Sequence, residues 1–239
     1  MLQLENINYK VTDEQGEKHI LKDINLTLDD RFVAFTGPNG SGKSTLAKII
    51  AGIITPTSGK IYFDGEDITN LFVTERAKRG ISYAFQQPVR FKGLTVRDLI
   101  NIAAGKPIKV AEACSYLSEV GMCARDYIDR EVNASLSGGE LKRIEIATIL
   151  ARATKLSVFD EPEAGIDLWS FGNLIKVFEK MHEKTKGNIL IISHQERILN
   201  IADRIVVIAD GRIKEEGKKG EVLPQLLGVD ACKALTAKL

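Results

Sequence analysis

The sequence reads Gly37-Pro38-Asn39-Gly40-Ser41-Gly42-Lys43-Ser44-Thr45 between an apolar run, residues 32–35, and a helix-forming segment, residues 46–51. A strand, a glycine-rich loop and a helix in this order form the context that a phosphate-binding P-loop requires. The glycines let successive backbone N–H groups turn toward one point, and the helix adds the positive end of its dipole. This stretch therefore predicts a nucleotide site.

Residue types within the loop indicate separate tasks. Lys43 can reach the β- and γ-phosphates of a nucleotide, and the Ser44 hydroxyl can coordinate Mg²⁺. A chance loop between a strand and a helix is the alternative, but the full spacing and context argue against it. The residues predicted to bind the nucleotide are Gly37, Pro38, Asn39, Gly40, Ser41, Gly42, Lys43, Ser44 and Thr45.

The composition is that of an ordinary soluble globular protein. The 239 residues carry a formal net charge of +1, which gives no global attraction to nucleic acid or to an anionic membrane. No apolar run is long enough to span a bilayer and residues 1–5 lack a signal-peptide pattern, so the expected location is the cytoplasm. The scattered cysteines, Cys114, Cys123 and Cys232, favour reduced thiols packed in helices over metal ligation.

Apolar runs without alternation predict a mostly parallel sheet covered by helices. Residues 81–85, 156–159, 188–192 and 205–208 are such runs, which are typical of strands buried on both faces. Alternation of apolar and polar residues near the N-terminus predicts an antiparallel β subdomain there instead. Residues 88–135 show apolar positions at helical spacing, which predicts an α-helical subdomain inserted into the sheet domain.

Three shorter elements are also predicted. Residues 13–18 read as a polar turn between two antiparallel strands. Residues 74–79 read as a short basic helix that is closed by Gly80. An amphipathic helix is expected in the C-terminal residues 217–239, with no function assigned to it.

Two adjacent acids follow the apolar run at residues 156–159. Asp160 can hold the Mg²⁺ shell through water, and Glu161 can orient or deprotonate the water that attacks the γ-phosphorus. Adjacent carboxylates on a surface are usually solvated charges, whereas these two end a buried strand. We therefore expect Asp160 at the metal and Glu161 in catalysis.

A second anion site is predicted where residues 137–151 form a helix. Ser137 is a natural N-cap, and Gly138 and Gly139 leave the first N–H groups of that helix bare toward an anion. By itself Ser-Gly-Gly-Glu is a common start of a helix. It carries weight here because the same chain holds a P-loop and a strand that ends in Asp-Glu.

The chain carries its P-loop, its Ser-Gly-Gly-Glu run and its Asp-Glu pair in the same order as the nucleotide-binding subunits of ABC ATPases, which it resembles. The resemblance covers nearly the entire chain. It implies one ABC ATPase domain over residues 1–239, with a P-loop NTPase core, a mostly parallel sheet, an N-terminal antiparallel β subdomain and an inserted helical subdomain. It also implies hydrolysis of ATP with Mg²⁺ as cofactor. A second copy of the chain is the implied partner, because in this family the P-loop of one subunit and the signature serine of another clamp ATP head to tail.

The resemblance implies further site residues. Gln86 falls on the glutamine expected to touch Mg²⁺ and the attacking water, with Gln87 as the neighbouring alternative. Asp167 falls on the family's D-loop beside the nucleotide, and His194 on the histidine that contacts the γ-phosphate. The family usually stacks an aromatic residue on adenine. Val11 stands at that position here, and Tyr9, which packing alone also explains, is the other candidate.

Two segments resemble SufC-type ATPases, which assist iron–sulfur cluster assembly: residues 84–96 and the Gly-Glu-Leu-Lys-Arg-Ile-Glu-Ile run at residues 139–146. Transporter subunits typically carry glutamines and an alanine-rich run there, so Glu145 is the most telling difference. Pro162 and residues 163–167 depart from the SufC-type pattern.

The SufC resemblance implies a SufB/SufD-like scaffold partner, and the alternative is a membrane permease subunit of an ABC transporter. Phe91 and Leu94 are candidate anchors for either partner, unless they pack beneath the helical insert. An ABC protein that acts on ribosomes or DNA is disfavoured, because 239 residues hold neither two cassettes nor a long coiled coil. We therefore expect no nucleic-acid partner.

Overall fold

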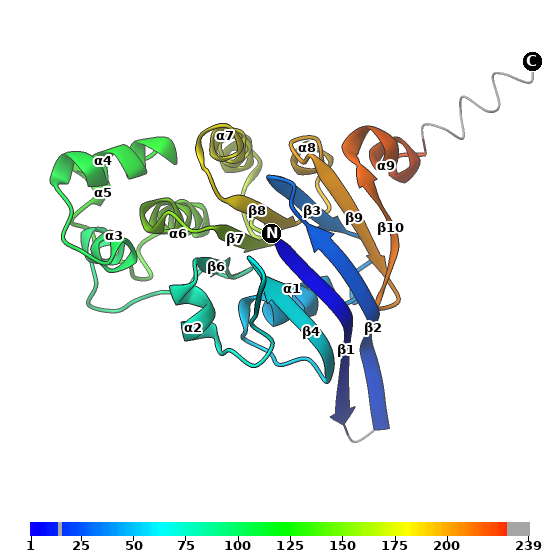
Figure 1. Ribbon diagram of the computed structural model, residues 1–239. Helices are drawn as coiled ribbons and strands as arrows, with labels where there is room; N and C mark the ends of the chain where they lie inside the picture. The colour runs from blue at the N-terminus through cyan, green and yellow to red at the C-terminus, as the bar shows by residue number, and fades with distance from the viewer. Residues whose placement is uncertain (14–15, 229–239) are drawn as a thin grey trace, which may run out of the picture. The chain divides into compact units, whose positions relative to one another are not determined.

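The structure, a computed structural model, describes residues 1–13 and 16–228 (Figure 1). The chain divides into two compact units. Unit 1 combines Met1–Lys78 with the chain from Leu190 onward, and unit 2 runs from Arg79 to Ile189.

Unit 1 contains an antiparallel sheet in the order β2-β1-β4-β5. Its strands are β1 (Leu2–Asp13), β2 (Gly16–Leu28), β4 (Ser58–Phe63) and β5 (Glu66–Asp67). Strands β1 and β2 form the long blue hairpin of Figure 1, where Leu4 lies opposite Leu26 and all the leucines of this pair are buried. The antiparallel β subdomain is confirmed. The turn predicted at 13–18 is too long, because the two strands run to Asp13 and from Gly16.

The second set of strands in unit 1 has the order β10-β9-β3-β8. Strand β3 pairs in parallel with β9, and β10 closes the edge antiparallel to β9. All five residues of β3 are buried, as expected for a strand covered on both faces. The bounds are β3 (Phe32–Thr36), β8 (Asn188–Ile192, of which residues 190–192 belong to unit 1), β9 (Arg204–Ala209) and β10 (Arg212–Lys218).

Short helices complete unit 1. They are α1 (Lys43–Ala51), α2 (Val73–Lys78), α8 (Glu196–Leu199) and α9 (Lys219–Leu226). Helix α1 follows the glycine-rich loop directly, as predicted, and α2 confirms the short helix expected at residues 74–79. Helix α9 confirms a helix in the C-terminal segment, and residues 229–239 of that expectation lie outside the described chain.

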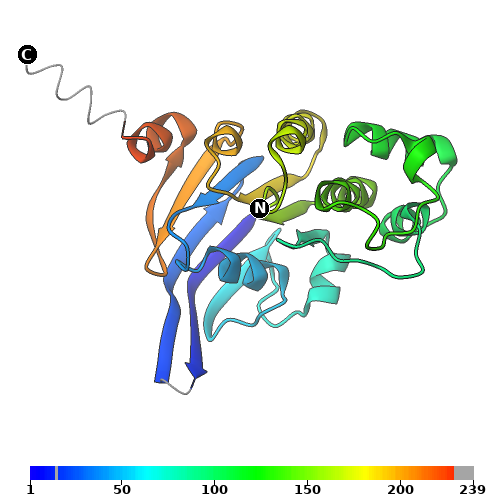
Figure 2. The ribbon, with the colours of Figure 1, turned by 180° about the vertical axis from the view of Figure 1, so that it is seen from behind.

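Unit 2 pairs β6 (Ile81–Ala84) in parallel with β7 (Leu156–Asp160). Its helices are α3 (Val96–Ala104), α4 (Val110–Glu119), α5 (Ala124–Tyr127), α6 (Gly138–Arg152) and α7 (Leu168–Lys184). Helices α3 and α4 pack against α6, which both ribbon views show in green (Figures 1 and 2). That residues 88–135 form a subdomain of their own remains a prediction.

One strand ends earlier than its apolar run predicts. The run at residues 81–85 predicts a buried Phe85, but β6 ends at Ala84 and Phe85 is 40% exposed. The Phe85 N–H leaves the sheet ladder and donates to the Glu145 carboxylate of α6 instead. Within residues 1–13 and 16–228, the helices fall short of the combined length and hydropathy that crossing a membrane requires.

Candidate nucleotide-binding and catalytic site

The glycine-rich loop lies in unit 1 between β3 and α1, and two of its glycines combine a left-handed backbone with close neighbours. Gly37 has a φ of 127°, and a Cβ built on it would stand 2.0 Å from the Ile208 carbonyl oxygen. Gly42 has a φ of 100°, and its Cβ would stand 2.6 Å from the Leu21 side chain. At Gly37 the backbone neighbour excludes a side chain, and at Gly42 the left-handed backbone and the contact with the Leu21 side chain make one strained.

The loop has the chemistry of a phosphate cradle. Lys43 is 4% exposed, and its ammonium donates to the carbonyl oxygens of Gly37 at 2.7 Å and Pro38 at 2.8 Å. The Ser41 hydroxyl is buried without a hydrogen-bond partner among the described residues. Gly42 caps α1 and has no side chain to bind the first N–H groups. A buried hydroxyl, a lysine held by the loop and an uncapped helix start fit the phosphates of a nucleotide.

The other predicted residues of unit 1 lie close to this loop. Pro38, Asn39 and Gly40 are exposed, while Ser44 and Thr45 are half-buried at the start of α1. His194 is exposed just after β8, and the N–H of its neighbour Ser193 donates to the Phe35 carbonyl at 3.1 Å. Since Phe35 belongs to the strand that leads into the loop, unit 1 brings His194 to the same strand end as the P-loop.

The two predicted acids lie in unit 2 and each accepts a hydrogen bond from the β6 region. The Tyr83 hydroxyl donates to Asp160 Oδ2 at 2.6 Å, and the Gln86 amide donates to Glu161 Oε2 at 2.6 Å. Burial and the hydrogen bond to Asp160 raise the pKa of Tyr83, so the phenol stays protonated and donating. Of the two neighbouring glutamines, Gln86 is thus the one that binds Glu161, and its contact with Mg²⁺ and the attacking water remains a prediction.

Glu161 has a φ of 44°, in the left-handed region that side chains rarely adopt. Such a backbone costs on the order of 1 kcal/mol and is found more often at functional sites than elsewhere. The strand ends at Asp160, and this turn of the backbone sends the next residue in a different direction. Asp160, 3% exposed, and the half-buried Glu161 therefore occupy different environments although they are neighbours in the chain.

Ser137 begins α6 as predicted. Its hydroxyl accepts from the Glu140 N–H at 3.3 Å, and Glu140 Oε2 accepts from the Ser137 N–H at 2.7 Å, which is a capping box. Gly138 is exposed and Gly139 half-buried. Asp167 Oδ1 accepts from the Ser170 N–H at 3.0 Å, so this side chain caps the first turn of α7. The nucleotide contacts of Ser137, Gly138, Gly139 and Asp167 remain predictions.

The donors predicted for Mg²⁺ suit that ion. In the part of the chain that the structure describes, no three His, Cys, Asp or Glu side chains cluster in a way that could hold a metal by themselves. Mg²⁺ commonly keeps several waters and takes one or two carboxylates together with substrate phosphates. The predicted donors, Ser44 in unit 1 and Gln86 and Asp160 in unit 2, are of the kinds that such an ion takes, and their binding to Mg²⁺ remains a prediction.

Comparison with known proteins gives the family. The model of the ABC transporter family matches residues 21–164, more than half of the chain. The chain belongs to the ABC transporter family. This cassette therefore binds ATP and hydrolyses it with Mg²⁺, and its fold is that of the P-loop ABC ATPases.

Individual relatives agree with the family. An uncharacterized ABC transporter ATP-binding protein of Methanocaldococcus jannaschii is 40% identical over 218 residues, covering 87% of this chain and 86% of the relative. The sulfate/thiosulfate import ATP-binding protein CysA of Synechocystis is 34% identical over 220 residues, covering 89% of this chain but 60% of the relative. A solved dimeric ATP-binding cassette in a post-hydrolysis state with ADP and Pi gives a TM-score of 0.80 at 25% identity, covering 92% of this chain and 99% of that chain.

The roles of two side chains in the cassette, Tyr83 and Arg76, are not predicted from the sequence. Tyr83 reads as an ordinary apolar strand residue, yet its hydroxyl holds Asp160. Arg76 reads as a surface residue of a basic helix, yet it is 1% exposed and donates to four backbone carbonyl oxygens. Nothing local in the sequence marks Arg76.

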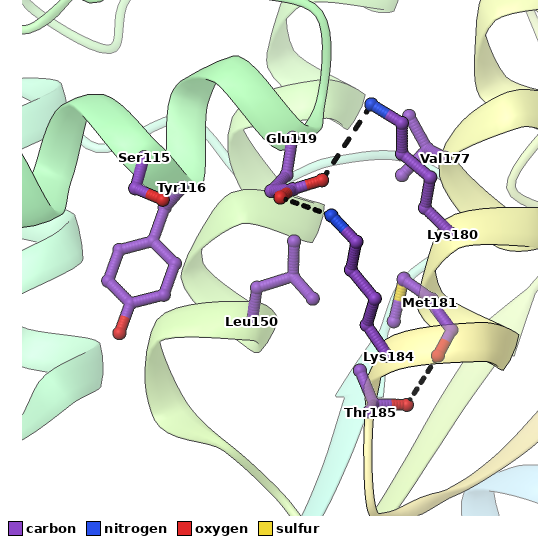
Figure 3. Close-up of a pocket in the computed structure, with 9 residues that line it drawn as sticks. All are labelled: Ser115, Tyr116, Glu119, Leu150, Val177, Lys180, Met181, Lys184 and Thr185. Carbon is purple, nitrogen blue, oxygen red and sulfur yellow. Dashed lines mark hydrogen bonds and ion pairs between the residues drawn. The ribbon is translucent and has the colours of Figure 1, made fainter.

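A cavity of about 210 Å³ lies among α4, α6 and α7 of the cassette (Figure 3). Its charged residues are bound to one another, since Glu119 accepts from Lys184 at 2.8 Å and lies 3.7 Å from Lys180. The Lys184 hydrogen bond holds the pKa of Glu119 below its ordinary value. The mutual pairing leaves no charged side chain of this cavity aimed at a ligand, so we regard the cavity as part of the packing of these three helices.

Proposed function

We propose that the cassette works as a pair of copies arranged head to tail, with ATP bound between the P-loop of one copy and the Ser137 end of the other. One observation carries the proposal. Each chain presents two helix starts suited to phosphate, α1 at Gly42 in unit 1 and α6 at Ser137 in unit 2. The dimeric state named for the similar cassette with ADP and Pi supports it.

Within such a pair, the residues of this chain divide the chemistry. The loop and Lys43 bind the β- and γ-phosphates, and the Glu161 carboxylate takes the proton of the attacking water. Gln86 holds that carboxylate through its amide, and His194 contacts the γ-phosphate. Mg²⁺, when bound, neutralises the charge that develops on the phosphate oxygens. The Ser137 helix start supplies donors to the γ-phosphate from the other copy, so hydrolysis removes the bridge between the copies.

For the partner that this motion drives, the names of the relatives favour a transporter. CysA is described as an import ATP-binding protein, and the M. jannaschii relative as an ABC transporter ATP-binding protein. We therefore place the ATP-binding subunit of an ABC membrane transporter, with a permease partner, ahead of the cluster-assembly function that the sequence patterns favour.

The cluster-assembly function remains as the second candidate because of one observation. The Lys-Arg-Ile-Glu pattern that resembles SufC-type ATPases forms a specific structure, in which Lys142 and Glu145 bind each other and the Phe85 backbone. In this candidate function the partner is a SufB/SufD-like scaffold.

Either partner would meet the segment that follows β6. In this segment Phe85, Val89 and Phe91 are exposed large apolar residues, beside the basic Arg90 and Lys92. Phe91, 41% exposed, fits an anchor, whereas Leu94 is half-buried and its carbonyl accepts from the Val132 N–H. We propose Phe91 as the main anchor because its side chain is the more exposed of the two, and Leu94, which is half-buried, stays the second candidate.

The partner can be identified by purifying the tagged chain from its own cells, with membrane and soluble fractions kept apart. We expect a multi-span membrane protein to copurify from the detergent extract, and Phe91→Asp to lower its affinity by about 30-fold, the effect of losing a strong interface residue. Val110→Asp, at another exposed apolar residue of unit 2, is the matched control and should keep the partner. A soluble scaffold protein, retained without detergent, would establish the second candidate instead.

A further inference from the structure

A buried ion pair joins the start of α6 to the residue before Gln86. The Lys142 side chain is 1% exposed and the Glu145 side chain 17% exposed, and the Lys142 ammonium donates to Glu145 Oε2 at 2.9 Å. Burial raises the pKa of Glu145, while the neighbouring Lys142 charge favours the ionised carboxylate. Burying two charges costs desolvation free energy that their mutual attraction often fails to offset. The pair is therefore weak evidence of added stability and suggests a different role.

Both residues of the pair also bind the same peptide. The Phe85 N–H donates to Glu145 Oε1 at 3.2 Å, and the Lys142 ammonium donates to the Phe85 carbonyl oxygen. Phe85 stands just beyond the end of β6, where the ladder with β7 has stopped. The ion pair therefore replaces the sheet in fixing this one residue.

The residues on either side of Phe85 reach the two acids after β7. Tyr83 donates to Asp160, and Gln86 donates to Glu161, both at 2.6 Å. Phe85 and Tyr83 also touch edge to face, with ring centroids 4.9 Å apart. A displacement of Phe85 would thus be passed directly to the amide that holds Glu161, and a shift of about 1 Å at a reacting group can cost about 100-fold in rate.

We infer that Lys142 and Glu145 are positioning residues for hydrolysis: by holding the Phe85 peptide they keep the Gln86 amide on the Glu161 carboxylate. The inference rests on the proposed role of Glu161 as the base. Helix α6 then has two tasks: its N-terminal end at Ser137 meets the ATP of the other copy, and its Lys142 and Glu145 set the geometry of the base within its own chain. Neither residue touches ATP in this scheme.

The test uses the full chain and steady-state ATP hydrolysis. Lys142→Met and Glu145→Gln should each lower kcat by about 10- to 100-fold while the KM for ATP changes by less than about threefold, because the P-loop is untouched. Gln86→Ala should lower kcat by a similar factor. Adding Lys142→Met to Gln86→Ala should cause little further loss, since residues that act through one another are not additive.

The double variant Lys142→Met with Glu145→Leu separates positioning from stability. Each single variant leaves one buried charge unpaired and should lower the thermal unfolding temperature. Removing both charges should bring that temperature back to the wild-type value, because a buried pair replaced by apolar side chains is often neutral or stabilising. It should leave kcat low, and the Phe85 N–H should exchange with deuterium faster. Glu119→Gln, which removes an ion pair elsewhere in unit 2, is the control and should keep kcat.

Two results would overturn the inference: recovery of kcat together with the unfolding temperature in the double variant, or additive losses for Lys142→Met and Gln86→Ala. Failure of the proposed base is recognised separately. If Glu161→Gln keeps its turnover, the role of Glu161 is wrong, whatever the Lys142 and Gln86 variants show.

Discussion

Replacing Glu161 with glutamine is expected to slow ATP hydrolysis by about 10²- to 10⁴-fold, the range that a positioned general base contributes. Glutamine has the size of glutamate but cannot take the proton of the attacking water. The P-loop is unchanged, so ATP should still bind between two copies and remain there. Phosphate release measures the rate, and light scattering with and without ATP measures the mass of the particle.

We expect this variant to stay monomeric without nucleotide and to become a stable dimer with ATP and Mg²⁺. Glu179→Gln, on the exposed face of α7, removes an equal charge from the same unit and should leave both rate and mass unchanged. An unaltered turnover in Glu161→Gln would remove this residue from the base role. Loss of turnover without an ATP-dependent dimer would contradict the clamped pair but not the base.

Replacing Arg76 with methionine is expected to destabilise unit 1 by about 2 to 5 kcal/mol, because each buried carbonyl left without a donor costs about 1 to 3 kcal/mol and water replaces part of the loss. The guanidinium donates to the carbonyl oxygens of Ile49 at 2.7 Å and Ile50 at 2.9 Å, at the end of α1, and to those of Leu71 and Thr69 at 2.9 Å. A cation also stabilises the negative end of a helix. Methionine fills the space but leaves four carbonyl groups without this donor.

Urea unfolding with a probe in unit 1 measures the loss. Burial lowers the pKa of Arg76 to about 10, which is still far enough above neutral pH for the side chain to be charged. Arg76→Lys is the matched control, because lysine keeps the charge but cannot span four acceptors, and about half of the loss is expected. A loss below about 1 kcal/mol in Arg76→Met would show that water replaces the guanidinium at these carbonyls.

Much of the site can be predicted because its chemistry is local in sequence. The glycines at 37 and 42 are required by backbone angles and by close neighbours, and the same positions are readable as a P-loop in the sequence. Ser137 is readable as an N-cap, and the structure gives it both bonds of a capping box. Strands such as β3 are readable because burial on both faces leaves no polar alternation.

The remaining features depend on contacts between distant segments. Arg76 binds carbonyls of residues that precede it by as many as 27 positions, and carbonyl groups carry no sequence signal. Phe85 is apolar and continues the run of a buried strand. Its backbone N–H nevertheless binds the Glu145 side chain of α6 and not the neighbouring strand. The pattern at Lys142 and Glu145 is visible in the sequence as a family resemblance, whereas its target at Phe85 is not.

The most direct test of the proposed composite site mixes two inactive variants. Lys43→Ala disables the P-loop, and Ser137→Asp keeps an N-cap residue but puts a carboxylate against the γ-phosphate. A head-to-tail pair formed from one copy of each contains one site with both halves intact. Each variant alone should be inactive, and an equal mixture should recover about one quarter of the wild-type rate, because half of the pairs are mixed and each has one working site. If mixed pairs form and no activity returns, or if Ser137→Asp alone hydrolyses ATP at the full rate, each copy does not supply half of the site.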